Sequence, residues 1–74
     1  AMTTLADELL RARTVLEGAG IVVTTDPADG RPDLSAVAGP VQHALAMVLR
    51  EAVTNVLRHA RAARCHVAVA VASG

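Results

Sequence analysis

Residues 50–60, REAVTNVLRHA, decide the fold, because they form the second half of a long amphipathic helix that we predict from Pro40 to about Ala60. Proline is favoured at the first position of a helix, where its missing N–H needs no partner. At ~100° per residue, the apolar side chains of this helix fall in one broad arc, which we expect to be its core face. The members of this arc are Val41, Leu45, Val48, Leu49, Ala52, Val53, Val56 and Ala60.

The other side of this helix is polar. Its members are Glu51, Thr54, Asn55 and Arg58, with His59 at the margin. Spacings of i, i+3, i+4 and i+7 place the first four within roughly 100°. A carboxylate can orient or deprotonate a nucleophile, an amide oxygen suits Mg²⁺, and Arg and His can donate hydrogen bonds to phosphate. These are the pieces of a magnesium-nucleotide site, but the same spacing also occurs on helix faces that are simply solvated.

A shorter helix is predicted upstream, over residues 4–17. Thr4 and Asp7 have the spacing of a capping box, and a GAG sequence at residues 18–20 supplies the glycines that favour a helix end. The β-branched run IVVTT, residues 21–25, then predicts a strand. The apolar residues of the helix recur at helical spacing and comprise Leu5, Leu9, Ala12 and Leu16.

A loop and a second strand complete the pattern. Residues 26–39 open with DPADGRPD, a composition that favours turns and has little to bury, so we expect a mobile loop. Residues 65–72, CHVAVAVA, alternate strictly, which predicts a half-buried strand with Cys65 and the valines on one side. Strand, helix and strand in this order favour two parallel neighbours with a right-handed crossover and both helices on the valine face.

Composition bounds the class of protein. The chain has 74 residues, enough for one small domain, and 53% of them are hydrophobic but none is aromatic. Positive and negative side chains balance and no lysine is present, which disfavours nucleic-acid binding. No apolar run approaches the ~20 residues that span a bilayer. The chain has a single cysteine, Cys65, which excludes an internal disulfide and fits a reducing, cytoplasmic setting. We interpret Ala1-Met2, at the start of the sequence, as a cloning remnant.

The sequence LREAVTNVLRHA, residues 49–60, resembles the N box of the histidine-kinase type of ATPase domain, the superfamily of gyrase, chaperone, kinase and mismatch-repair ATPases. The pattern there is Glu, three residues, Asn, two residues, Lys or Arg, then His or Tyr and a small residue. ELLRARTVLEGAGIVV before it and ARCHVAVAV after it are similar to the flanks of this motif in sensor kinases of the NarL/DesK-like group. The resemblance covers nearly the whole chain and implies part of a Bergerat-type α/β sandwich.

The resemblance also implies roles for the polar face. Glu51 would orient or activate the attacking group, Asn55 would be the Mg²⁺ ligand, and Arg58 and His59 would contact the phosphates of ATP. The parent protein would transfer the γ-phosphoryl group to a histidine on an upstream dimerisation domain and then to an aspartate of a response regulator. This domain would lie in the cytoplasm, in a parent with or without a membrane anchor. His43 lacks the adjacent acidic residue expected of such a phosphoacceptor.

Two family elements are not in this sequence, namely the DxGxG box and the glycine-rich ATP lid, both expected beyond Gly74. Residues 1–74 are therefore interpreted as the N-terminal part of the ATPase domain, inactive alone. Two alternatives stay open. One is the ATPase domain of an anti-sigma-factor serine kinase, and the other is a non-catalytic association module. A valine-rich strand at an unprotected edge further predicts homo-oligomers or strand exchange.

Overall fold

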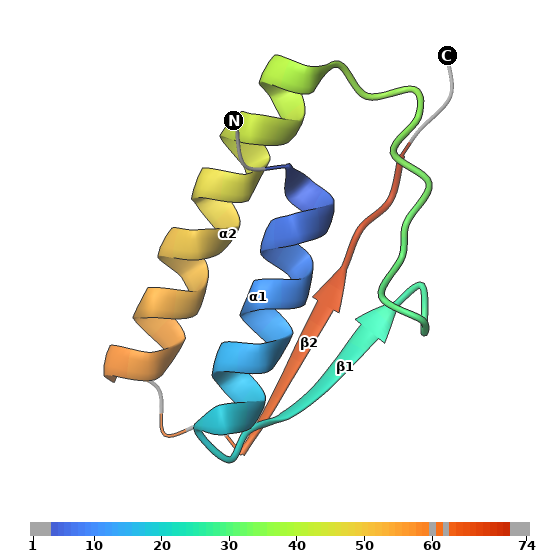
Figure 1. The fold of residues 1–74 in the computed structure, drawn as a ribbon. Helices are drawn as coiled ribbons and strands as arrows, with labels where there is room; N and C mark the ends of the chain where they lie inside the picture. The colour runs from blue at the N-terminus through green and yellow to red at the C-terminus, as the bar shows by residue number, and fades with distance from the viewer. Residues whose placement is uncertain (1–3, 60, 62, 72–74) are drawn as a thin grey trace.

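The computed structural model describes residues 4–59, 61 and 63–71. Helices and strands follow the predicted order, and the two helices lie side by side next to the pair of strands (Figure 1). The chain therefore has an α/β fold of two helices and two parallel strands. The elements are α1 (Leu5–Gly18), β1 (Val22–Asp26), α2 (Gly39–His59) and β2 (Arg64–Ala68). The predicted ends at Ala60 and Ala72, and the interpretation of Ala1-Met2, fall outside the described residues.

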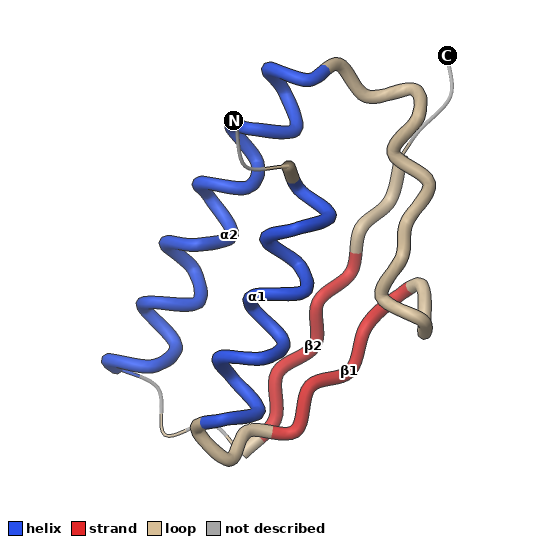
Figure 2. Tube along the Cα trace, in the orientation of Figure 1, coloured by secondary structure: helices blue, strands red, loops and turns tan. Residues whose placement is uncertain are grey.

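The two strands lie side by side and pair in parallel, as predicted (Figure 2). In their register Val23 lies opposite Cys65, and Thr24 lies opposite His66. β2 is shorter than the predicted 65–72, because its partner ends first. Asp26 is the last residue of β1 and is paired with Ala68. One more hydrogen bond follows, from the Val69 N–H to the Asp26 carbonyl at 2.9 Å, and beyond it the described chain has no strand to pair with.

Helix α1 forms as the sequence predicts. The side chain of Thr4 accepts a hydrogen bond from the Asp7 backbone N–H at 3.1 Å and caps the helix start. All four predicted core residues, Leu5, Leu9, Ala12 and Leu16, are buried. Their stripe faces α2 and the sheet, so α1 is the central element of the core.

The segment between β1 and α2 is more anchored than the predicted mobile loop. Gln42, in the first turn of α2, donates from its side-chain amide to the carbonyls of Leu34 and Val37, at 3.3 and 3.0 Å. Leu34 and Val37 themselves are half-buried. The loop composition correctly indicated turns, but it did not reveal that a helix side chain holds the second half of the loop.

The buried face of α2 differs from the predicted apolar arc. Val41, Leu45, Val48 and Ala52 are exposed, whereas Leu49, Val53 and Val56 are half-buried. Ala46, which lay outside the arc, is fully buried. The helix is turned by roughly one residue step of ~100° from the predicted orientation, toward Arg50.

The core lies where α1, α2 and the inner face of the sheet meet. Leu16, Ile21 and Val23 form its buried cluster, and the half-buried Val53, Val56 and Cys65 pack against that cluster. Both helices thus cover the Cys65 and valine side of β2, as predicted. Neither of the described helices combines the length and apolar character needed to cross a bilayer.

Candidate functional site

The predicted site residues share the solvent-facing side of α2. Glu51, Asn55, Arg58 and His59 are all exposed. Glu51 and Asn55 are one helical turn apart, as are Asn55 and His59, so their side chains project from neighbouring positions. A single straight helix therefore holds the four groups together, without help from a loop.

Among the described residues, none of these four side chains makes a hydrogen bond or ion pair. Thr54 behaves differently, since it is half-buried and donates its hydroxyl to the Arg50 carbonyl at 3.0 Å. Side chains without internal partners keep their donors and acceptors available to a ligand. Side chains on a solvated face also lack internal partners. The chemical character of the four groups therefore has to distinguish a binding face from a solvated one.

The donor set fits a magnesium phosphate. Mg²⁺ in phosphate-transfer sites is usually held by one or two protein oxygens and the phosphates of the substrate, with water completing its octahedron. Asn55 offers a neutral amide oxygen and Glu51 offers a carboxylate. Arg58 and His59, one turn further along, add donors for phosphate oxygens. The described residues contain no cluster of three or more His, Cys, Asp or Glu that would hold a metal without a substrate.

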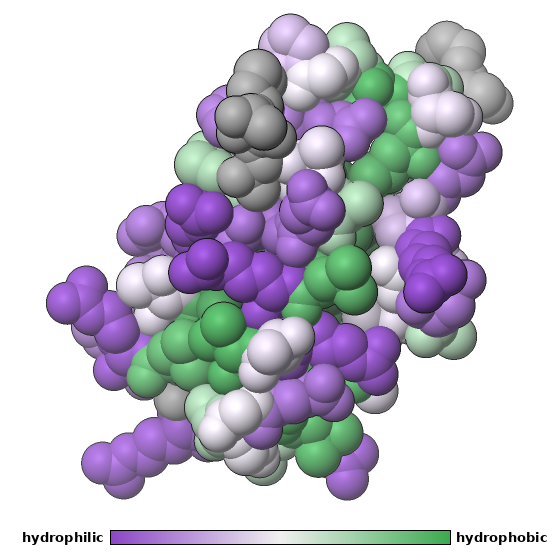
Figure 3. Space-filling view, in the orientation of Figure 1, coloured by the Kyte–Doolittle hydropathy of each residue, from purple (hydrophilic) through white to green (hydrophobic). Residues whose placement is uncertain are grey.

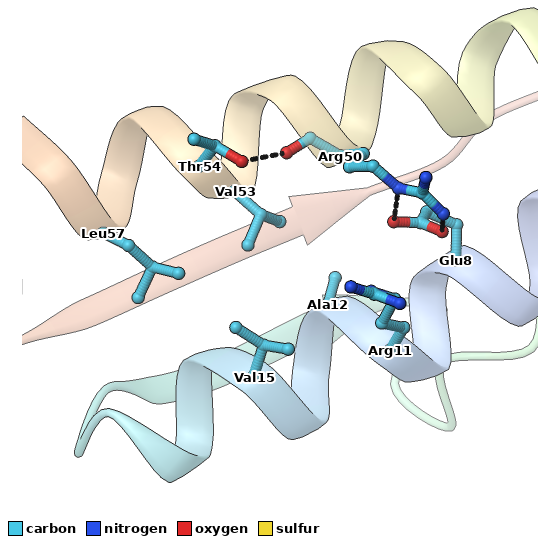
Figure 4. A pocket seen from close by; sticks show the side chains of 8 residues that line it. All are labelled: Glu8, Arg11, Ala12, Val15, Arg50, Val53, Thr54 and Leu57. Carbon is cyan, nitrogen blue, oxygen red and sulfur yellow. Dashed lines mark hydrogen bonds and ion pairs between the residues drawn. The ribbon is translucent and has the colours of Figure 1, made fainter.

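Glu8 and Arg50 form an ion pair that the sequence patterns did not predict. Arg50 donates to both carboxylate oxygens of Glu8, from Nε to Oε1 and from Nη2 to Oε2, each at 3.1 Å (Figure 4). Glu8 is only 3% exposed, whereas the Arg50 side chain is 45% exposed. These hydrogen bonds and the negative charge of Glu8 raise the pKa of Arg50 above its ordinary value. The sequence signal for this pair was a glutamate that borders the apolar stripe of α1, together with an arginine directly before Glu51.

A shallow pocket of about 170 Å³ lies beside this ion pair, between the two helices. The surface between the two helices includes an apolar area that is bordered by polar side chains (Figure 3). Glu51, Asn55, Arg58 and His59 do not line the pocket, so the predicted site lies apart from it. The lining residues are Glu8, Arg11, Ala12, Val15, Arg50, Val53, Thr54 and Leu57.

His66 lies on the outer face of the sheet. His66 is exposed and its Nδ1 lies 2.7 Å from the Thr24 hydroxyl across the strand pair. Cys65 lies on the opposite face and is half-buried. The two neighbours therefore cannot share a metal ion, in agreement with the predicted alternation.

Comparison with known proteins gives one curated relative. The chain is 30% identical, over 66 residues, to the sensor histidine kinase YvfT of Bacillus subtilis (strain 168). The match covers 89% of this chain but 17% of that protein. No family model matches the chain, and no solved structure matches it. The similarity supports a relation between this chain and sensor histidine kinases.

Proposed function

We propose that this chain is the first part of the ATP-binding domain of a sensor histidine kinase, and that the polar face of α2 binds the phosphates of Mg²⁺-ATP. The observation that carries the proposal is the set of four exposed side chains on one side of a single helix, none of which has a partner among the residues that the structure describes. The similarity to a sensor histidine kinase supports the same function. A cytoplasmic location follows from the use of ATP.

The four residues have distinct chemical roles in this proposal. Asn55 provides the amide oxygen for Mg²⁺, which neutralises phosphate charge when bound. Glu51 orients or deprotonates the attacking group from the adjacent turn. Arg58 and His59 donate hydrogen bonds to phosphate oxygens. Phosphoryl transfer depends on positioning and charge neutralisation more than on covalent chemistry, so a rigid helix face suits the task.

The whole reaction is assigned to the parent protein. This chain spans about 17% of the length of the relative that it matches. The parent would pass the γ-phosphoryl group to a histidine and then to a response regulator, using further segments to hold the adenine and close over the nucleotide. The 74 residues alone would supply part of the phosphate site.

Calorimetry with Mg²⁺-ATP tests the proposal, on the 74-residue chain and on the complete parent protein. Asn55→Ala in the parent should weaken binding by ~10-fold or more, equivalent to ~1.4 kcal/mol. Glu17→Ala is the matched control, because Glu17 is also an exposed helical residue but lies on α1. If the parent bound Mg²⁺-ATP equally well with and without Asn55→Ala, the assignment of the site would be refuted.

Phosphotransfer by the parent separates two kinase classes. An acid-labile phosphohistidine is expected from a sensor histidine kinase, whereas an acid-stable phosphoserine would indicate the anti-sigma-factor type. Either product requires the polar face of α2, so Glu51→Gln should abolish both. The product, and not the loss of activity, therefore decides the class.

A second candidate function is association with another copy of the chain. It rests on the exposed apolar side chains of α2, since Val41, Leu45 and Val48 are 51%, 44% and 64% exposed. Apolar side chains grouped on one helix face are typical of protein contacts. Concentration-dependent sedimentation tests this candidate, as described in the Discussion.

A further inference from the structure

The rotation of α2 about its axis leaves part of its apolar arc exposed to solvent. Its most apolar side includes Val48, which is 64% exposed, whereas Arg50 points toward α1 and its carboxylate partner. A helix that buried its apolar arc would place Val48 closer to the core and Arg50 closer to water. Hydrophobic burial alone therefore does not account for the observed rotation of α2 about its axis.

Val53 and Val56 of α2 pack against the cluster that contains Leu16 of α1, but both are only half-buried, and the other fully buried side chains between the helices are small. Ala12 of α1 and Ala46 of α2 are 3% and 0% exposed, and both have side chains of a single methyl group. Small side chains let helices approach closely, but they offer no large knob that fits only one hole. Val53 and Leu57 border the pocket next to Ala12 and so leave part of the helix interface open.

The ion pair adds a directional constraint to this packing. Two parallel hydrogen bonds join the Arg50 guanidinium to the Glu8 carboxylate, and this geometry constrains both direction and distance. Glu8 is buried at the margin of the α1 stripe, so turning Arg50 away would leave a buried carboxylate without its partner. Buried ionic groups contribute to structural specificity in some proteins in this way.

We propose that Glu8, acting through Arg50, is a positioning residue that sets the rotation of α2 and thereby the direction in which Glu51 and Asn55 project relative to α1 and the sheet. Arg50 directly precedes Glu51, so any rotation that carries Arg50 away from α1 carries the polar face with it. The consequence for nucleotide binding rests on the proposed function, whereas the consequence for helix orientation does not.

Replacing one partner of the ion pair with an apolar residue should allow α2 to turn about its axis. In Glu8→Leu, Arg50 faces an apolar partner, and α2 gains by turning Arg50 to water and Val48 toward the core. In Glu8→Leu/Arg50→Leu, both partners are apolar and can pack against each other, so the native rotation should return. Leucine pairs often replace buried ion pairs without loss of stability, so the double variant is expected to fold.

Two cysteine reporters on opposite sides of α2 measure the rotation. Val48→Cys and Leu57→Cys are each made in a Cys65→Ala background, and their alkylation rates are compared at a concentration where the chain is monomeric. In Glu8→Leu the rate at position 48 should fall several-fold while the rate at position 57 rises. The double leucine variant should restore both rates.

The outcomes separate positioning from simple stabilisation. Unchanged rates in Glu8→Leu, or acceleration at both reporters, would overturn the proposal, because general loosening exposes both sides together. Glu17→Gln is the control, since it removes the exposed Arg13–Glu17 pair of α1 and should change neither rate. In the parent, Mg²⁺-ATP affinity should fall in Glu8→Leu and recover in the double variant. Binding that is insensitive to Asn55→Ala would instead refute the proposed function and leave the alkylation result standing.

Discussion

Ile21 donates its backbone N–H to the carbonyl of Leu16 at 3.0 Å, and the side chains of both residues belong to the buried core cluster. Gly20 lies between them with φ of +82° and donates to the Glu17 carbonyl at 2.9 Å. The two hydrogen bonds and the apolar contact form a Schellman motif at the end of α1. This motif turns the chain from α1 into β1 and joins the helix end to the core.

Alanine at the two glycines of this turn should have opposite effects. Gly20→Ala should destabilise the fold by ~1–2 kcal/mol, because an L-residue is strained at positive φ. Gly18→Ala, at the last position of α1, should stabilise it by ~0.5–1 kcal/mol, because alanine favours the helix and restricts the unfolded chain. Neither added methyl group would have another atom within 4 Å, so steric clashes do not complicate the comparison. Urea unfolding measures both free energies.

Leu16 should be one of the most sensitive positions in the chain. It is 0% exposed and lies in the buried cluster, so Leu16→Ala should cost ~2–5 kcal/mol. Leu10→Ala is the control, because Leu10 lies on the same helix and is 63% exposed. A free energy of unfolding that drops equally in both variants would contradict the assignment of the core.

The cap of α1 gives a smaller, local effect. Thr4→Ala removes the acceptor for the Asp7 N–H and should cost ~1 kcal/mol. Thr14→Ala serves as a comparison, because Thr14 bonds the Leu10 carbonyl in mid-helix, where alanine is the better helix former. Circular dichroism during thermal unfolding should show a lower Tm only for Thr4→Ala.

The sequence predicted α1 well, because its stripe of leucines has one clear period and its cap and glycines mark both ends. The apolar pattern of α2 misled the prediction of its buried face. A pattern based on hydropathy assigns Arg50 to the solvent-facing side of the helix. It does so because the partner of Arg50, Glu8, is 42 residues away in sequence and lies outside the local pattern. The length of β2 was overestimated for a related reason, since pairing with β1 and not alternation sets where the strand ends.

The polar face of α2 was placed correctly as a surface, because Glu51, Asn55, Arg58 and His59 are all exposed. Its role in binding stays a prediction. Periodicity predicts which side chains share a face, but it does not give the rotation of that face relative to the rest of the protein. That rotation depends on a contact between α1 and α2, which no local pattern contains.

Asp33 should titrate below its ordinary range. Hydrogen bonds from the side chain and the backbone N–H of Ser35 lower the pKa of Asp33 below 3.8. The charged form is favoured in the fold, so this contribution to stability is present above the unfolded pKa and is lost as pH falls through the folded pKa. Ser35→Ala should raise the pKa of Asp33 but leave it below its ordinary value, because the backbone donor remains. Carboxyl NMR titration of both proteins measures the difference.

Self-association through α2 is the last prediction. Val41, Leu45 and Val48 follow one another at spacings of four and three residues, and Leu45 and Val48 also border an apolar groove with Val67 and Val69 of the β2 segment. A second copy that covered this surface would remove apolar area from water, at ~25 cal/mol per Å².

Sedimentation should therefore show a mass that rises from micromolar to millimolar concentration, and Val48→Glu should shift the chain toward the monomer. Val22→Glu is the matched control, because Val22 is also exposed, at 56%, but lies on the outer face of β1. If Val22→Glu alone abolished association, copies would meet through the sheet and not through α2. A mass that stayed monomeric at every concentration would refute self-association and leave the nucleotide-binding proposal as the remaining function of the chain.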